Sequence, residues 1–409
     1  MAGTACHVLH APLQRGLTLA LGFNLTLVAT MKNNQLPIIG LVCFAAVATA
    51  CSASEPKSIS EWIVRPSSEL SIPRAAHQTT AISPTLVLVT GGCSGSGCTP
   101  VERSAELVHI ETGRSEVTQP MNEARVAHAA ALLKDGRVLV AGGWTGDMAT
   151  ASAEVFDPQH RSFSPVQAMA TARMDATATP LLNGSVLVTG GASATNLPIS
   201  HAEVFDQTQN RFVAVGAMHE ARAHHAAVRM QDGRVLVVGG QRGRNLATNS
   251  AEIYDPATEA FTLSGSMQLP RCKHAAVLLK DGRVMVIAGS SDCDDRRRLA
   301  QTEIYDPSTG QFTAGPPLLN PRYKIIDATT VLPSGEVVVA GDATDVEIWT
   351  PGTPAFIKVG ESIDNGLAFS TATHLPNGSV LILGGYDNDI RPTAQAWVIS
   401  RTRAADNHN

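Results

Sequence analysis

The chain has 409 residues, of which 44% are hydrophobic, and a formal net charge of −5 at pH 7. This length allows a large buried core, and the mild acidity gives no electrostatic basis for binding nucleic acid or an anionic membrane surface. Only 16% of residues are charged and 4% aromatic, whereas glycine occurs 34 times, which is typical of sheet proteins with many tight turns.

Residues 1–50 are predicted to be a leader segment and not part of the fold. The apolar run LPIIGLVCFAAVATA at 36–50 follows a positive start at Met31 and is shorter than the roughly 20 residues that a membrane-spanning helix needs. Residues 1–30 precede this better start, and we interpret them as a mispredicted extension that leaves the true start codon open.

The leader ends at Cys51, which is followed by the small, polar stretch SASEPKS. This arrangement resembles the lipobox of bacterial lipoproteins, in which the cysteine is lipidated and becomes the mature N-terminus, although Ala48 stands where that family usually has Leu. The alternative is a secretory peptide cleaved after Ala50. Both interpretations predict an exported protein. The first places it at the cell envelope, with a lipid anchor, in the periplasm or on the outer-membrane surface; the second predicts a secreted protein. We expect residues 51–60 to be a flexible tether.

From residue 61 to residue 401 the dominant signal is an internal repeat. In its second copy the repeat consists of HAAALL (128–133), RVLVAGG (137–143), AEVFDP (153–158) and SFSPVQAM (162–169). Each segment is short and rich in β-formers or small residues, and turn signals such as Asp-Gly separate them. Each unit is therefore predicted to be a four-stranded antiparallel sheet.

The copies align on a pair of small residues after the second strand, 44 to 52 residues apart. The first members of the pairs are Gly91, Gly142, Gly190, Gly239, Ala288, Ala340 and Gly384. One small sheet cannot bury both its faces alone, whereas packing copies around an axis buries them and leaves only short edges.

The spacing, the paired glycines, the AEVFDP-like third strands and the R-x-x-H openings resemble the kelch repeat of the galactose-oxidase-like superfamily. The resemblance implies an all-β kelch-type β-propeller. The chain departs from the family pattern at the fourth-strand Trp, where it has Phe163, Phe212, Phe261, Phe312 and Phe356.

Six full units begin near Arg74, Arg125, Arg173, Arg222, Arg271 and Arg322, and residues 369–400 supply three strands of a seventh. The segment EWIVRPSSELSIPR (61–74) can provide the missing fourth strand. We therefore predict seven blades closed by the N-terminal strand, with six blades as the alternative. Residues 402–409 are expected to be a disordered tail.

Four cysteines remain outside the leader and Cys51, an even number in an oxidising compartment. We predict a Cys93–Cys98 bridge and a Cys272–Cys293 bridge. The second pair lies at the rim that would bind ligands, since one cysteine opens a first strand and the other follows a second strand. No CxxC-type spacing supports a metal site there, and no cofactor is implied.

The candidate ligand-binding residues belong to loops expected at one rim of the channel. The repeated R-x-x-H residues could form a cationic ring for a carboxylate, but their recurrence in each blade favours a structural role, in which each Arg pairs with a third-strand Glu such as Glu154. Residues that break the repeat are better candidates, including Asp327, Lys324 and Arg244. The set that we predict for the rim is Arg125, His128, Trp144, Asp175, His224, His225, Arg242, His274, Tyr323 and Tyr386.

No GxSxG, HExxH or P-loop spacing is present. Copper-radical oxidases of the superfamily need an adjacent Tyr-His pair, and none of the four tyrosines here is next to a histidine. We therefore expect a monomeric binding module, without catalytic residues, for a protein partner or a small carbohydrate or carboxylate. The alternative is a carbohydrate isomerase on the same scaffold, resembling the kelch-type sialic acid mutarotases. A cluster of titratable residues with shifted pKa values at one channel mouth would favour the enzyme.

Overall fold

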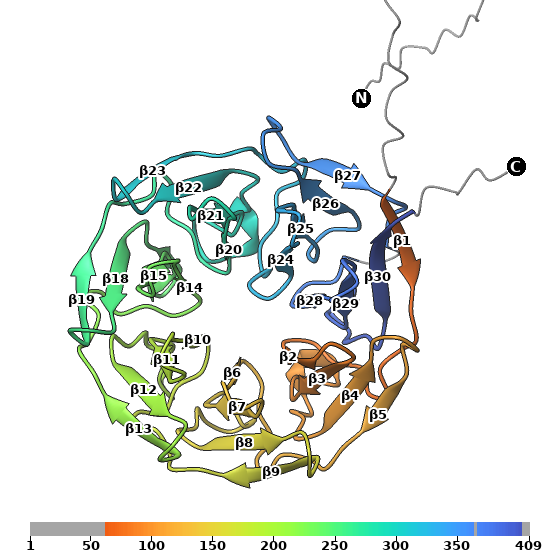
Figure 1. Ribbon diagram of the computed structural model, residues 1–409, viewed down its shortest axis with the longest axis horizontal. Helices are drawn as coiled ribbons and strands as arrows, with labels where there is room; N and C mark the ends of the chain where they lie inside the picture. Colours follow the sequence, from red (N-terminus) through yellow and green to blue (C-terminus); the bar gives the residue numbers. More distant parts are fainter. Residues whose placement is uncertain (1–61, 364–365, 403–409) are drawn as a thin grey trace, which may run out of the picture. The chain divides into compact units, whose positions relative to one another are not determined.

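The computed structural model describes residues 62–363 and 366–402. In this part of the chain, seven four-stranded antiparallel sheets stand as blades around a central axis (Figure 1). The only helical elements described are two short 3₁₀ segments, η1 (Ser96–Cys98) and η2 (Asp295–Arg297), and neither is long or apolar enough to cross a membrane. The predicted seven-bladed all-β propeller is confirmed, and the six-bladed alternative is wrong.

The strands of each blade follow one another from the axis outward. Blade 1 contains β2 (Gln78–Ser83), β3 (Leu86–Thr90), β4 (Ala105–His109) and β5 (Ser115–Val117); blade 2 contains β6 (Ala129–Leu132), β7 (Val138–Ala141), β8 (Ala153–Asp157) and β9 (Ser162–Pro165). Blade 3 contains β10 (Thr177–Pro180), β11 (Val186–Thr189), β12 (Ala202–Asp206) and β13 (Arg211–Ala214); blade 4 contains β14 (Ala226–Arg229), β15 (Val235–Val238), β18 (Ala251–Asp255) and β19 (Ala260–Leu263).

Blade 5 contains β20 (Ala275–Leu278), β21 (Val284–Ile287), β22 (Thr302–Asp306) and β23 (Gln311–Ala314); blade 6 contains β24 (Thr329–Val331), β25 (Val337–Val339), β26 (Val346–Trp349) and β27 (Ile357–Val359). Blade 7 contains β28 (Thr371–His374), β29 (Val380–Leu383), β30 (Ala396–Arg401) and β1 (Trp62–Pro66), and a small ribbon, β16 (Gln241–Gly243) with β17 (Leu246–Ala247), extends blade 4.

The repeated DGR sequence makes the turn between the first two strands of a blade. In blade 2, Gly136 has a φ of +88°, which glycine adopts without steric cost. The Asp135 carboxylate accepts hydrogen bonds from the Arg137 backbone N–H (3.1 Å) and the Arg137 Nε (2.8 Å). These tight turns, together with those between the third and fourth strands, form one face of the propeller, the turn face. The longer loops between the second and third strands, and the links between blades, form the other, the mouth face.

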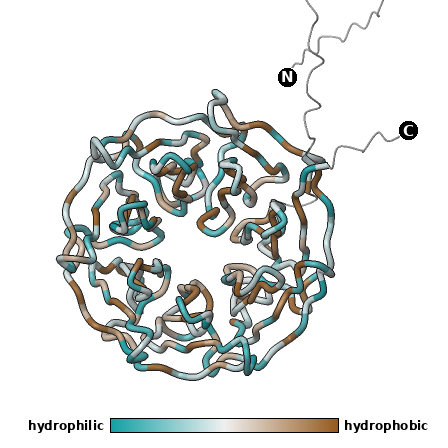
Figure 2. The backbone as a smooth tube through the Cα atoms, viewed as in Figure 1, coloured by the Kyte–Doolittle hydropathy of each residue, from teal (hydrophilic) through white to brown (hydrophobic). Residues whose placement is uncertain are grey.

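Neighbouring blades bury hydrophobic residues between their broad faces, and Figure 2 shows hydrophobic stretches in every blade separated by hydrophilic loops. Between blades 2 and 3, Leu139 and Val155 pack with Val188, Phe205 and Phe212 in one cluster. The rings of Phe205 and Phe212 lie 5.0 Å apart at their centroids, and three other blades repeat this pair. The fourth-strand Phe thus fills the inter-blade core, as predicted.

The lead-in arginine of each of the first six blades is fully buried and forms an ion pair with a third-strand glutamate. The N–O distances range from 2.5 to 2.8 Å for the pairs Arg74–Glu106, Arg125–Glu154, Arg173–Glu203, Arg222–Glu252, Arg271–Glu303 and Arg322–Glu347. Each Nη1 also donates to the backbone carbonyl of the first residue of the small-residue pair. These arginines therefore link strands within a blade and do not form a cationic ring at the mouth.

This contact corrects one step of the repeat alignment. In blade 6 the acceptor of the Arg322 Nη1 is the Gly341 carbonyl, so the pair is Gly341–Asp342 and does not begin at Ala340. Arg322 and Gly341 are 19 residues apart, whereas the separation is 17 in the other five blades. Blade 6 therefore contains two additional residues between its lead-in arginine and its second strand.

Blade 7 is closed by the N-terminal strand, as predicted. β1 pairs antiparallel with β30 from Trp62↔Arg401 to Pro66↔Trp397. The Arg401 guanidinium lies 4.7 Å from the Trp62 ring centroid and forms an ion pair with Glu336 of blade 6. Strand β1 thus begins on the turn face.

Both predicted disulfides are present. Cys93–Cys98 closes the short loop after β3, with Cα atoms 4.8 Å apart, and Cys272–Cys293 joins the start of blade 5 to the loop after β21, with Cα atoms 5.4 Å apart. The leader at 1–50, Cys51, the tether at 51–60 and the residues from 403 onward lie outside the described residues.

Candidate functional site

Seven equivalent residues, one from each blade, surround the axis at the mouth face, and we call them the axial ring. Each has a left-handed backbone, with φ between +51° and +57°. Such a conformation costs non-glycine residues roughly 1–2 kcal/mol and persists only where the surrounding structure imposes it. The ring consists of Ala76, Ala127, Asp175, His224, Lys273, Lys324 and Phe369.

Backbone hydrogen bonds run from blade to blade around the axial ring. The Asp175 N–H donates to the Ala127 carbonyl at 2.9 Å, and the Lys273 N–H donates to the His224 carbonyl at 3.0 Å. The series continues through all seven blades, with Ile325 replacing Lys324 as donor in blade 6. Since the ring backbone is the same in every blade, the chemical character of the mouth depends on which side chains occupy it.

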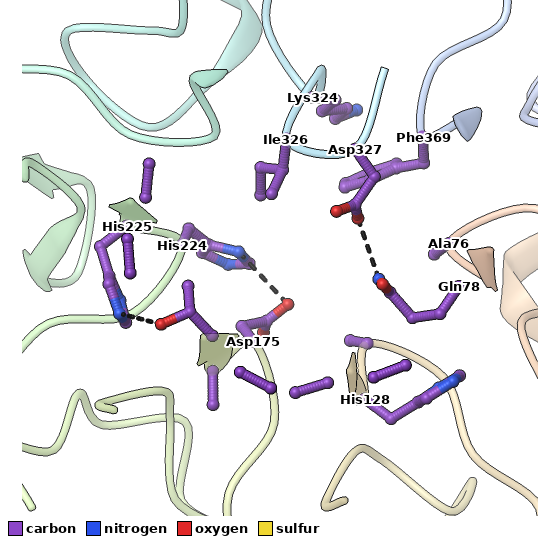
Figure 3. A pocket seen from close by; sticks show the side chains of 18 of the residues that line it. Ala76, Gln78, His128, Asp175, His224, His225, Lys324, Ile326, Asp327 and Phe369 are labelled. Carbon is purple, nitrogen blue, oxygen red and sulfur yellow. Dashed lines mark hydrogen bonds and ion pairs between the residues drawn. The ribbon is translucent and has the colours of Figure 1, made fainter. Parts of the chain in front are cut away.

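A cavity of about 200 Å³ lies between the axial ring and the first strands. Small residues such as Ala130, Ala178 and Ala227 form much of its wall and leave the space open. Figure 3 shows polar side chains from several blades that project into this space. The cavity is slightly smaller than typical small-molecule sites, which lie at about 300–1,000 Å³.

Two ring residues, Asp175 and His224, contact each other at one side of the cavity. The His224 Nδ1 lies 3.2 Å from the Asp175 Oδ1, in a contact that is not aligned as a hydrogen bond. The two side chains are 15% and 18% exposed. Burial lowers the pKa of His224, against the opposing effect of Asp175, and Lys273 lowers it further. The imidazole is therefore neutral near pH 7 and can accept a proton.

The additional residues of blade 6 place a carboxyl group in the cavity. They form the turn at Ile326 and Asp327, and the Asp327 Oδ2 accepts a hydrogen bond from the Gln78 Nε2 of blade 1 at 2.9 Å (Figure 3). Asp327 is open to solvent along the channel, but the walls surround it and limit its hydration. This desolvation raises the pKa of Asp327, while the bond from Gln78 opposes the rise.

Positively charged groups gather at the blade 5 and blade 6 side of the mouth. The Tyr323 ring centroid lies 4.6 Å from the Lys324 Nζ, 5.9 Å from the Lys273 Nζ and 4.9 Å from the Arg298 Cζ. Asp342, which replaces the second glycine of the blade 6 pair, accepts a hydrogen bond from the Tyr323 N–H at 2.8 Å and pairs with Arg298 at 3.1 Å. The mouth is therefore chemically asymmetric.

No group of three or more His, Cys, Asp and Glu residues suited to a metal ion occurs within residues 62–363 and 366–402. In comparisons with known proteins, the Kelch motif matches residues 125–170, 222–268 and 271–319, which are blades 2, 4 and 5. The chain is a kelch-repeat β-propeller. No curated protein matches the chain. A kelch propeller suggests a binding or protein-interaction module.

The kelch propeller places the predicted rim residues in three environments. Asp175, His224, His128 and His225 line the cavity. The two repeated histidines form its inner wall, where burial lowers their pKa values well below the usual range. The Nε2 of His128 lies 2.9 Å from the Thr90 Oγ1 of the preceding blade, so this histidine links two blades.

Arg125 and His274 are fully buried within the blades, and neither is among the residues that line the cavity. Tyr323 is also buried, beneath the three cationic groups. The other three residues follow second strands: Trp144 and Tyr386 lie in loops, and Arg242 lies in β16. Tyr386 packs edge-on against Phe369, with the ring centroids 6.4 Å apart. The Arg242 Nη1 lies 3.6 Å from the Glu220 Oε1.

Several site residues were not identified from the sequence. Lys273 and Phe369 belong to the axial ring, Gln78 holds Asp327, and Asp342 holds Arg298. The position two residues after the lead-in arginine, or after Leu367 in blade 7, carries a signal for the first two, because five different residue types occupy it in the seven units. The longer spacing between Arg322 and Gly341 carries the signal for Asp342, because it places this residue at the second position of the blade 6 pair.

Proposed function

We propose that this kelch propeller is an exported, lipid-anchored binding module of the bacterial cell envelope, and that it binds a small polar ligand in the mouth cavity. The observation that carries this proposal is the contrast between the repeated Arg–Glu pairs and the polar residues that break the repeat. The repeated arginines and glutamates are buried in ion pairs, whereas the residues that break the repeat, such as Asp175, His224 and Asp327, face one cavity.

The geometry supports a ligand of a few hydrogen-bonding groups. Asp175 and Asp327 offer carboxyl oxygens, and His224 offers a ring nitrogen, from different sides of a space of about 200 Å³. The axial ring fixes the backbones of Asp175 and His224, and Gln78 holds the Asp327 side chain, so little ordering is required when a ligand enters. A rigid ring with convergent polar groups is an arrangement typical of small-ligand sites.

A ligand screen with matched variants tests this function. Asp175→Ala and His224→Ala suit the ring backbone, because Ala76 and Ala127 already occupy equivalent positions with the same φ. We expect ligands from a panel of sugars and sugar acids to raise the melting temperature of the wild-type protein and not that of either variant. Equal shifts in all three proteins would place binding elsewhere and contradict the proposal.

Export and anchoring form a separate part of the proposal. They are supported by the leader, by Cys51 and by the position of β1, which begins at Trp62 on the turn face, opposite the mouth. In bacteria expressing the full chain, we expect a palmitate analogue to label the wild-type protein but not Cys51→Ala. Label retained in the variant would contradict lipid anchoring at this residue and leave the ligand site unaffected.

A second candidate function, a carbohydrate isomerase, is favoured by the shifted pKa values of the cavity. His224 could accept the proton of an anomeric hydroxyl, while the Asp327 carboxyl group, whose pKa is raised by desolvation, could donate a proton to the ring oxygen as its bond to the anomeric carbon breaks. NMR exchange measurements on reducing sugars test this reaction. Faster anomer exchange that Asp327→Asn and His224→Ala both abolish would establish an enzyme, and unchanged exchange would leave the binding module.

A further inference from the structure

The side chains of the axial ring are polarised across the mouth. Blades 5 and 6 contribute Lys273 and Lys324, whereas blades 1 and 2 contribute Ala76 and Ala127. Because the backbone conformation is common to all seven positions, no difference of fold requires lysine at two of them. The two lysines therefore need an explanation in the chemistry of the mouth.

The lysines form part of a larger cationic group around Tyr323. Lys324 lies between two aromatic rings, 4.6 Å from the Tyr323 centroid and 5.4 Å from the Phe369 centroid. Arg298 faces the same tyrosine at 4.9 Å, and Lys273 is 5.9 Å from it. Cation–π contacts stabilise each charge, but they also hold three like charges close to one ring.

Acidic residues also lie near this cationic group, and Asp342 interacts electrostatically with both Arg298 and Lys324. Asp342 pairs with Arg298, and Asp175 and Asp294 influence Lys273, whose pKa is lowered mainly by burial. Asp342 also holds the Tyr323 backbone, so it positions both the arginine and the aromatic ring. A bound anion at the lysines would relieve the repulsion among the cations.

Two carboxyl groups of the cavity favour a different chemical group from the one that the lysines favour. Asp175 and Asp327 are carboxyl groups, and Asp327 already accepts a hydrogen bond from Gln78. Carboxylates repel an anion but accept hydrogen bonds from hydroxyl groups. A ligand that satisfies both needs a negative group for the lysines and hydroxyl groups for the two carboxyl groups.

We propose that the mouth cavity binds a small hydroxylated carboxylate, such as a sugar acid, with its carboxylate at Lys324, the lysine that lines the cavity, and its hydroxyl groups toward Asp175, His224 and Asp327. This inference rests on the proposed function of the cavity and specifies the class of ligand. A carboxylate carries one charge and suits a mouth that also contains acids. A phosphorylated sugar, which carries more charge, is an alternative that the test distinguishes.

The experiment uses the whole mature propeller and isothermal titration with D-glucuronate, D-galacturonate and D-gluconate. The comparison ligands are neutral D-glucose and D-glucose 6-phosphate. We expect at least one of the three acids to bind at least 10-fold more tightly than glucose and more tightly than the phosphate. Binding should weaken as salt concentration rises, because the interaction is partly ionic.

Lys324→Ala is the main variant, and Lys280→Ala, an exposed lysine at a turn of blade 5, is the matched control. Loss of one charged hydrogen bond typically reduces affinity about 10- to 100-fold, and we expect this loss for Lys324→Ala alone. Alanine suits the ring backbone, as at Ala76, and urea unfolding of each variant confirms that the fold is kept.

The outcomes separate the two proposals. Tighter binding of neutral glucose, or acid binding that Lys324→Ala leaves unchanged, would overturn the carboxylate inference while the cavity remains a ligand site. Preference for glucose 6-phosphate would also overturn it. Binding by no member of the panel to the wild-type protein would contradict the inference and the proposed cavity function together.

Discussion

The buried ion pair of blade 4 allows a quantitative prediction about what holds each blade together. Arg222 is fully buried, and its guanidinium donates to the carbonyls of Gly239 (2.8 Å) and Ser250 (3.2 Å), to the Ser250 Oγ (3.0 Å) and to Glu252 (2.8 Å). In Arg222→Leu, the buried Glu252 carboxylate loses its counter-ion and two carbonyls lose a donor. Breaking one partner of a buried pair costs about 3–5 kcal/mol.

Blade 7 provides a natural comparison for this variant. At the positions equivalent to the arginine and the glutamate it has Leu367 and Trp397, which pack together in a hydrophobic cluster. Both charges are therefore replaced together, as expected if either one alone is costly to bury. We predict that Arg222→Leu/Glu252→Gln is destabilised by less than the sum of the two single variants, by about 1–3 kcal/mol.

Urea unfolding followed by tryptophan fluorescence measures these differences. Arg234→Leu is the control, because its pair with Asp232 is exposed, at 38% and 43% for the two side chains, and such pairs contribute about 0–1 kcal/mol. A loss below about 1 kcal/mol for Arg222→Leu, or full additivity in the double variant, would refute the view that the pair acts as a unit.

Three further predictions concern other parts of the propeller. Burial lowers the pKa values of His77 and His274 to about 3, so these histidines take up protons in the unfolded chain, and not in the folded protein, as pH falls below about 6.5. The free energy of unfolding should therefore decrease by about 2 kcal/mol per histidine at pH 5. Thermal unfolding should show a smaller loss between pH 7 and pH 5 for His77→Gln/His274→Gln than for the wild-type protein. Val64→Asp, in the closing strand, should cost about 2–3 kcal/mol and accelerate limited proteolysis, and resistance equal to wild type would contradict the role of β1. Gly239→Ala should lower the free energy of unfolding in urea by about 1–3 kcal/mol, because φ is +61° and the added Cβ would lie 2.7 Å from the Arg271 carbonyl oxygen. An unchanged urea midpoint would show that this crowding is relieved.

The sequence was sufficient for the fold because the repeat carries it. Periodic β-formers, Asp-Gly turns and the paired small residues predict four strands per unit, and the unpaired segment at 61–74 predicts the closing strand. The recurrence of the arginines favours their pairing with the third-strand glutamates, and their complete burial in such pairs confirms this prediction. These features depend on local chemistry that recurs in each unit.

The candidate site could be predicted only in part, because it depends on how different units meet at the axis. Asp175 and His224 were noted as departures from the repeat, but their 3.2 Å contact joins two blades and has no local signature. The bond between Gln78 and Asp327 joins blades 1 and 6. The additional residues in blade 6 were also hidden by aligning Ala340 in place of Gly341.

The pairing of β1 with β30 also has a consequence for the order in which the protein matures. The two strands lie far apart in the sequence, since Trp62 pairs with Arg401. Blade 7 therefore cannot be completed on the ribosome until the segment up to Arg401 has emerged. Until then, Trp62 and Val64 lack the hydrophobic cluster against which they pack in the finished wheel.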